Sequence, residues 1–492
     1  MCQSIDTAYV GIAHAGSTNY PSQSDGFRPS ESYPEYSFAE IAEQQNDVYA
    51  AVRESLHLMG LDAEHYGTPD WNPFIDIIHA GDTVLVKPNL VRDSNTNLSG
   101  GVECLYTQPS VVAPVLDYVF KALNGTGRVV LGDAPMQECD FDALIKQSGY
   151  QELVQYYIDK GLPLQLVDFR KDITTVRFRI GTRETDEKVP GTIVNLAEES
   201  EFYGAEDADP DKLRIISYPH DNLAKHHHGA VQEYCVSSYV LNADVIINMP
   251  KPKTHKKAGI TGAMKNMVGA CAKKDFLPHH TYGSSEEGGD EYLKKNRLQR
   301  YRSDLYDRKY QYEDQRKFFR AWLVWTRIAV CTSIFRVFKL KYENGSWYGN
   351  HTNSKTINDL NKIVFYANKD GVMQESQQRR YFIVADMIIS GQKNGPVAPS
   401  PKDVGIIAAG DNPVCFDEAL AALMGFDKNK IPTLVQARNA KPKYSVSNGK
   451  VHTVLLSNQE KWNKKDISTI ERKESFQYVV SDGWKGHIEL EK

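Results

Sequence analysis

Apolar runs separated by amphipathic stretches dominate the first third of the chain. The runs at residues 82–90, 128–131 and 164–169 each predict a buried strand, and helical periodicity at residues 109–123 and 141–160 predicts the helices between them. Uninterrupted apolar strands are typical of sheets covered on both faces, and regular alternation with helices is typical of parallel pairing. The pattern predicts an α/β fold with a mostly parallel, doubly wound, Rossmann-like sheet.

The pattern resumes in the second half of the chain. Residues 243–249, 380–390 and 405–409 predict further strands, and residues 415–424 predict a helix. Residues 171–239 instead hold short β-like pieces in polar sequence, which predicts a β-rich elaboration of the sheet. The sequence therefore predicts three parts: an α/β domain at residues 1–290, a helical insertion at 291–345, and a C-terminal α/β region at 346–492 that completes the site.

The helical insertion contains the most apolar stretch of the chain, residues 321–340. Arg327 and Arg336 lie within it, and a helix spanning a membrane would have to hide both. We therefore predict no transmembrane segment and favour a core helix for this stretch. The alternative is an amphipathic helix in weak contact with a membrane surface through residues 320–341.

Composition narrows the classes of protein. Hydrophobic residues make up 41% and charged residues 25% of 492, which is typical of globular proteins, and the net charge of -5 predicts no nucleic-acid partner. The seven cysteines include no C-x-x-C pair, so no iron–sulfur cluster is expected. These scattered thiols, and residues 1–6 without a basic and apolar leader, predict a cytoplasmic protein whose oligomeric state stays open.

The strongest candidate site is the segment at residues 251–269. It follows a predicted strand, is rich in lysine and opens a helix, so its backbone N–H groups and its charge would suit an anion. His255 is predicted as a catalytic base or metal ligand, because its side chain can exchange protons near neutral pH. Lys265 is predicted to hold the anion or a cofactor. Lysines that merely solvate a surface loop are the alternative.

Polar residues at other strand ends are expected to line the same site. Carboxyl ends of parallel strands share one edge of a sheet, where small polar ligands bind. For each residue alone, ordinary turn chemistry is the alternative. With the residues of the central segment, the predicted substrate-binding set is Lys87, Asn89, Asp133, Lys253, Gly259, Gly262, Asn266, Asn394, Gly395 and Asp411.

Several segments together resemble a known family, catalogued as domain of unknown function 362, over residues 82–426. The segments are Val84 to Leu90, Gly132 to Pro135, Ala243 to His255, Gly262 to Gly269, Asn394 to Pro396 and Asp411 to Asp417. Many members of that family carry a ferredoxin-like insert with iron–sulfur cysteines. This chain has the helical insertion instead.

A shorter pattern is similar to the core motif of the nickel-pincer lactate racemase family. It runs from His255 through Gly259 and Gly262 to Lys265. In that family the histidine is a catalytic base or metal-side residue, and the lysine anchors the cofactor. The similarity implies a histidine and a lysine facing one pocket, with a metal ion as one candidate cofactor and the cofactor's identity open.

Two functions remain open from the sequence. The first is a cofactor- or metal-dependent enzyme, isomerase-like or oxidoreductase-like, acting by proton or hydride transfer on a small anionic or hydroxylated substrate such as a hydroxy acid, a sugar or a sugar acid. The second is a non-catalytic anion-binding or scaffold protein with the helical insertion as its docking surface. The second function predicts that Trp322, Trp325 and Phe335 are exposed.

Overall fold

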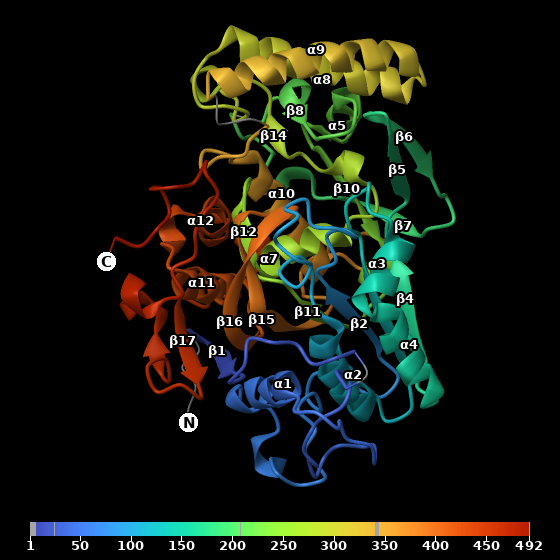
Figure 1. Ribbon diagram of the computed structural model, residues 1–492, viewed down its shortest axis with the longest axis vertical. Helices are drawn as coiled ribbons and strands as arrows, with labels where there is room; N and C mark the ends of the chain where they lie inside the picture. Colours follow the sequence, from blue (N-terminus) through green and yellow to red (C-terminus); the bar gives the residue numbers. More distant parts are fainter. Residues whose placement is uncertain (1–5, 24, 207, 340–343, 492) are drawn as a thin grey trace.

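The centre of the fold is an 11-stranded sheet in a computed structural model that describes residues 6–23, 25–206, 208–339 and 344–491 (Figure 1). The neighbouring strands β4, β3, β2, β11 and β15 run parallel, whereas β16 is antiparallel to both β15 and β1. The main strands are β1 (Thr7–His14), β2 (Thr83–Pro88), β3 (Arg128–Asp133), β4 (Leu164–Asp168), β11 (Val245–Met249), β15 (Arg380–Asn394), β16 (Ala398–Gly410), β17 (His452–Ser457) and β18 (Lys465–Asp466).

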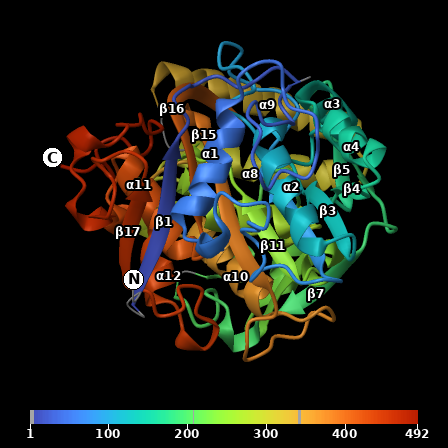
Figure 2. The same ribbon diagram turned by 90° about the horizontal axis from the view of Figure 1, so that it is seen from below.

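Helices cover both faces of this sheet, because strand side chains alternate between two apolar cores. Val84 and Val86 of β2 share one core with helices α1 and α2, while Leu85 shares the other with α10 and α11. In Figure 2, α1 and α2 lie in front of the strands. The predicted α/β fold with a mostly parallel sheet is confirmed. The helices named are α1 (Asp47–Leu58), α2 (Pro109–Leu123), α10 (Thr352–Tyr366) and α11 (Pro413–Met424).

Residues 171–239 form small antiparallel sheets beside the main one. Strand β5 (Asp172–Arg177) pairs with β6 (Ile180–Thr185), and β10 (Val231–Ser237) pairs with β7 (Gly191–Asn195) and β9 (His227–His228). A further short pair joins β8 (Leu213–Arg214) to β14 (His280–Thr281), which holds the end of the loop before β14 beside β8.

The helical insertion is a hairpin of α8 (Arg297–Asp314) and α9 (Phe318–Val337) that lies across one end of the molecule (Figure 1). The favoured interpretation of a core helix is wrong for α9. Only 28% of its most apolar window is buried, because α8 is its main packing partner and covers a single stripe. By length and composition alone, α9 is the one helix of the described residues that could span a membrane. Trp322 is exposed, Trp325 half-buried and Phe335 buried.

Candidate functional site

The order of strands along the sheet reverses between β2 and β11. From β2 the chain moves outward through β3 to β4, and it returns on the other side of β2 as β11 and then β15. In open α/β sheets, ligands bind at the carboxyl ends of the strands at such a reversal. A cavity of about 390 Å³ lies there. Its lining includes five residues predicted from the sequence: Asn89, Asp133, His255, Lys265 and Asn266.

The lining of this cavity combines positive charge with apolar surface. Among the residues that the structure describes, four lysines line it against two carboxylates, those of Asp133 and Glu138. The carboxylate of Asp133 already has three donors within the protein. Its oxygens accept from Lys87 Nζ at 2.7 Å, Leu90 N at 2.8 Å and Ala134 N at 2.9 Å. The apolar part of the lining includes Val91, Met136, Val268, Leu277 and Val397. This combination suits an anionic compound with an apolar body.

Lys265 is the lysine best placed to meet such an anion. It comes from the short helix α7 (Ala263–Asn266) and is half-buried. Its side-chain ammonium donates to no residue among those that the structure describes. Burial, followed by repulsion from Lys274 and Lys257, lowers its pKa to about 7. Burial also lowers the pKa of Lys257 to about 8. An anion among these lysines would restore their charge, so the cavity should take up protons when it binds one.

His255 lies at the end of β12 (Lys253–His255) with one ring nitrogen fixed by the backbone. Its Nδ1 accepts from Lys257 N at 3.0 Å and from Ala258 N at 3.1 Å. Burial, then repulsion from Lys265, holds its pKa well below the usual range, so the ring is neutral at pH 7. A neutral ring that accepts at Nδ1 carries its proton on Nε2. His255 therefore presents an N–H donor to the cavity.

His279 shows the opposite arrangement. Its Nδ1 lies 2.7 Å from Leu277 O, so Nδ1 carries the proton and donates to that carbonyl. Burial, then repulsion from Lys257 and Lys265, lowers its pKa to about 3 and leaves Nε2 as a lone pair in the cavity. Sequence reasoning did not assign chemistry to His279. Its only signal was a place in a Pro-His-His loop, because the pairing of β14 with β8 that positions it is not local.

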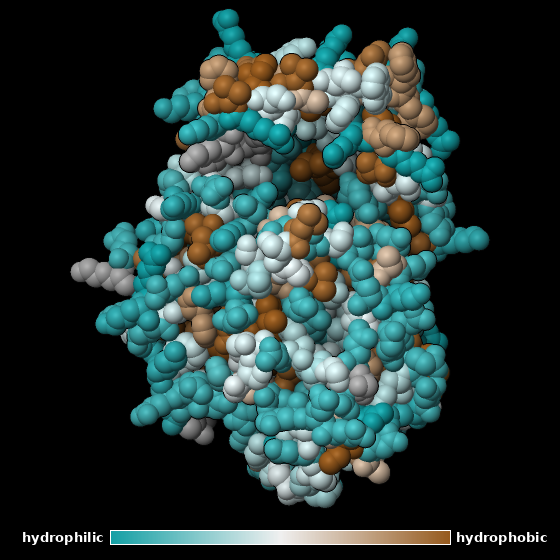
Figure 3. All heavy atoms as spheres, viewed as in Figure 1, coloured by the Kyte–Doolittle hydropathy of each residue, from teal (hydrophilic) through white to brown (hydrophobic). Residues whose placement is uncertain are grey.

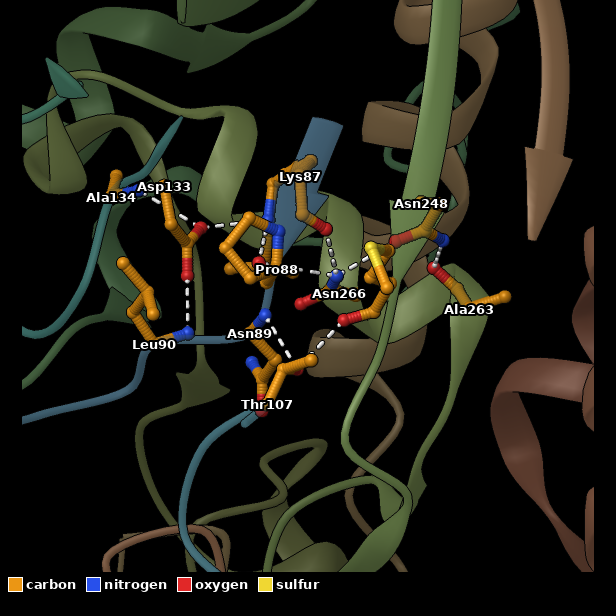
Figure 4. Close-up of polar contacts among 12 residues, drawn as sticks. Lys87, Pro88, Asn89, Leu90, Thr107, Asp133, Ala134, Asn248, Ala263 and Asn266 are labelled. Carbon is orange, nitrogen blue, oxygen red and sulfur yellow. Dashed lines mark hydrogen bonds and ion pairs between the residues drawn. The ribbon is translucent and has the colours of Figure 1, made fainter. Parts of the chain in front are cut away.

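The carboxyl end of β2 is held by a buried polar network (Figure 4). The ion pair of Lys87 with Asp133 has both side chains almost fully buried. Lys253 donates to Asn89 Oδ1 at 2.5 Å and to Leu105 O at 2.9 Å, and burial, then repulsion from Lys251, lowers its pKa to about 7. Lys87 and Lys253 thus support the floor of the site, while Asn89 belongs to its lining.

Asn266 has one satisfied and one unsatisfied end. Its Nδ2 donates to Asn248 Oδ1 at 2.7 Å and to Lys87 O at 3.3 Å, whereas its buried Oδ1 has no partner in the described part of the chain. In Figure 4 this oxygen points away from Asn248. A buried carbonyl without a donor costs free energy, so a ligand or water that donates to it would be favoured.

The two glycines of the central segment have structural partners. A Cβ on Gly262 would collide with the carboxylate of Asp417, and Gly259, with a φ of 78°, packs against Trp484. Neither glycine is part of the cavity lining. The N–H groups at the start of α7 are capped by Asp417, so they are not available to an anion.

The structure separates Asp411 from the other predicted residues. Asp411 follows β16, and because β16 is antiparallel to β15, its carboxyl end lies at the opposite edge of the sheet. Asp411 lines a different cavity there, with Asp244 and Arg380. Gly395 O accepts from Lys256 N at 3.1 Å, and the residues that follow Asn394 and Gly395, Pro396 and Val397, line the functional cavity.

A metal ion needs several donor side chains in one place. Within the ranges that the structure describes, no cluster of three or more His, Cys, Asp or Glu side chains could hold one. The two N–H groups at His255 Nδ1 place the proton on Nε2, the nitrogen that would face a metal in the cavity. His255 is therefore poorly suited to the predicted role of metal ligand.

Comparison with known proteins identifies a family. The sequence pattern described as "Domain of unknown function (DUF362)" matches residues 84–197 and 191–422. The chain is 27% identical over 199 residues to the thylakoid-associated protein sll1697 of Synechocystis sp., a match covering 40% of this chain and 42% of that relative. The lactate racemase apoprotein of Thermoanaerobacterium thermosaccharolyticum aligns over 88% of this chain and 85% of its own, at 8% identity and a TM-score of 0.30, too low to support an argument about fold or chemistry.

Proposed function

Because the chain belongs to the family described as "Domain of unknown function (DUF362)" and segments of the matched region line one cavity, we propose that it is an enzyme that binds a small anionic substrate there and transfers a proton on it. The observation that carries this proposal is the opposite hydrogen bonding of two histidines. His255 accepts at Nδ1 and offers Nε2–H, while His279 donates at Nδ1 and offers the Nε2 lone pair.

The lining supports an anion as the substrate class. Lys265 would contact the anionic group, and Asn266 Oδ1 would accept from a hydroxyl of the substrate. The apolar lining near Val268 and Leu277 would pack against the rest of the molecule. A hydroxy acid with an apolar side chain carries all of these groups and a sugar acid carries the first two, so we propose this class of substrate.

A bound anion would also make His279 a stronger base. Burial, followed by repulsion from Lys257 and Lys265, lowers the pKa of His279 to about 3, which makes it a weak base. A bound carboxylate offsets the charge of the lysines and raises that pKa towards the working pH, where a general base is most effective. His279 Nε2 would then take a proton from the substrate, and His255 Nε2–H would stabilise the negative charge that the broken bond leaves behind.

Solvent-exchange measurements test this proposal. The purified protein is incubated in D₂O with a panel of 2-hydroxy acids and sugar acids, and loss of the proton beside the carboxylate is followed by NMR. We expect proton exchange with one class of substrate. His279→Asn should abolish this exchange, because asparagine has no basic nitrogen in place of Nε2. The asparagine amide can still donate to Leu277 O, so the loop should keep its structure. Elemental analysis and mass spectrometry of the same native protein identify any metal or organic group it carries.

The alternative function is a non-catalytic anion-binding protein. It would bind the same acids through Lys265 without catalysing exchange, and binding would survive the change of either histidine. Saturable binding of an acid by the native protein with no exchange, and no effect of His279→Asn, would favour this alternative over the enzyme.

We also propose a cytoplasmic location. Six described cysteines (Cys104, Cys139, Cys235, Cys271, Cys331 and Cys415) are buried free thiols, which fits a reducing compartment. The name of the Synechocystis relative associates that protein with thylakoids. For this chain, we therefore propose a cytoplasmic protein able to contact membranes from the cytoplasmic side.

A further inference from the structure

Helix α9 exposes an apolar stripe on the side opposite α8. Its buried residues, Ala321, Val324, Ile328, Cys331 and Phe335, recur every three or four positions and form the contact with the rest of the protein. A second set recurs with the same period on the outward side: Phe319, Leu323, Val330 and Val337, which are 72%, 43%, 61% and 77% exposed. Apolar side chains concentrated on one exposed face indicate an interaction surface.

The charged residues of α9 itself have a single sign. Helix α9 contains Arg320, Arg327 and Arg336 and no acidic residue, and all three arginines are exposed. On the helical projection Arg320 and Arg327 lie along one side of the apolar stripe and Arg336 along the other. This arrangement, an apolar face flanked by cations, is typical of helices that lie in the interface of a bilayer with anionic lipids.

The position of the hairpin makes the stripe accessible to a flat surface. The hairpin lies across one end of the molecule (Figure 1), and apolar side chains gather at this end among hydrophilic ones (Figure 3). A helix lying flat on the end of a globular protein can be applied to a plane along its whole length. A second copy of the chain is a poorer partner, because pairing the same stripes would place arginines of both copies close together.

We propose that α9 docks the protein on the surface of membranes that contain anionic lipids. Phe319, Leu323, Val330 and Val337 enter the boundary between headgroups and acyl chains, and Trp322 lies at the headgroup level. Arg320, Arg327 and Arg336 pair with lipid phosphates. The hairpin remains packed on the protein, so α9 lies in the interface and does not cross the bilayer. This proposal does not depend on the chemistry of the cavity.

Vesicle flotation tests it with the full-length protein. The probes are vesicles of phosphatidylcholine alone and of phosphatidylcholine mixed with phosphatidylglycerol. We expect flotation with the mixed vesicles only, reversed by high salt, and a blue shift of tryptophan fluorescence on binding. Arg327→Gln should weaken partitioning about fivefold, and Phe319→Ser about tenfold or more. Ile75→Ser changes an exposed apolar residue, 50% accessible, outside the hairpin and should have no effect.

Any of four outcomes would overturn the proposal. The first is no binding to mixed vesicles at low salt, with circular dichroism showing folded protein. The second is binding that Phe319→Ser and Arg327→Gln leave unchanged. The third is a stable dimer in sedimentation that Phe319→Ser dissociates, which would assign the stripe to a second copy. Extraction from cell membranes that requires detergent, not salt or alkali, would instead indicate a spanning helix and also contradict docking in the interface.

Discussion

The carboxylate of Asp417 occupies the space beside Gly262 and caps the helix that begins there. Asp417 Oδ1 accepts from Ala263 N at 2.6 Å, and Oδ2 accepts from Met264 N at 3.0 Å. The contact joins α11 to the segment that contains Lys265, across 154 positions of sequence. Only glycine leaves room for this carboxylate, so Gly262 is required for the packing of the site and not for contact with a ligand.

Replacing Gly262 with alanine should therefore destabilise the protein through Asp417. We expect Gly262→Ala to lower the free energy of unfolding by about 3 kcal/mol, because the new methyl group overpacks the site and displaces the cap. Chemical denaturation measures this change. In an Asp417→Ala background the same substitution should cost less, since the obstructing carboxylate is gone. Equal costs in both backgrounds would contradict this explanation.

The ion pair below the cavity should contribute to stability in a similar way. Lys87→Met leaves the buried carboxylate of Asp133 without its charged partner, although Leu90 N and Ala134 N still donate to it. We expect a loss of about 3 kcal/mol in the free energy of unfolding, the usual cost of breaking a buried pair from one side. The control is Lys473→Met, which removes a solvent-exposed pair with Glu471 and should not change stability measurably.

The sequence predicted the parallel strands and part of the site because both depend on local pattern. Apolar runs mark β2, β3 and β11, and the polar residues that follow them, such as Asn89 and His255, line the cavity. Asp411 was grouped with them because the direction of β16 cannot be read from its composition. The exposure of α9 was missed for a related reason: an apolar helix indicates burial, but not how many neighbours the fold provides.

The two cavity histidines should hold their protons on different nitrogens. We expect NMR of the ¹⁵N-labelled protein at pH 7 to show His255 with its proton on Nε2 and His279 with its proton on Nδ1. The physical reason is the backbone, since His255 Nδ1 faces two N–H groups and His279 Nδ1 faces a carbonyl. Identical tautomers for both rings would remove the basis for assigning them opposite roles.

Paired substitutions separate the structural and chemical roles of His255. In His255→Asn the amide oxygen can replace Nδ1 as the acceptor for Lys257 N and Ala258 N, so the loop should keep its stability while Nε2–H is lost. In His255→Gln the longer side chain withdraws that acceptor, and two buried N–H groups lose their partner. We expect denaturation to show a loss of about 2 kcal/mol for His255→Gln and little change for His255→Asn. The reverse order would contradict the hydrogen bonding described.

Anion binding should weaken as pH rises, because the free cavity holds a lysine that is half-charged near neutrality. The pKa of Lys265 is about 7, so its ammonium is present below that pH and lost above it. A bound anion raises this pKa, and binding above pH 7 must then be accompanied by proton uptake. Sulfate is a suitable probe for this anion site, since it remains fully ionised throughout the range.

Calorimetry should show the affinity for sulfate falling about tenfold per pH unit above pH 7 for one coupled proton. Lys265→Met should bind sulfate more weakly at pH 6 and lose about one proton from this dependence, whereas Lys273→Met, a change outside the cavity lining, should behave like the unaltered protein. A sulfate affinity that is independent of pH, or a slope unchanged in Lys265→Met, would show that Lys265 does not meet the anion.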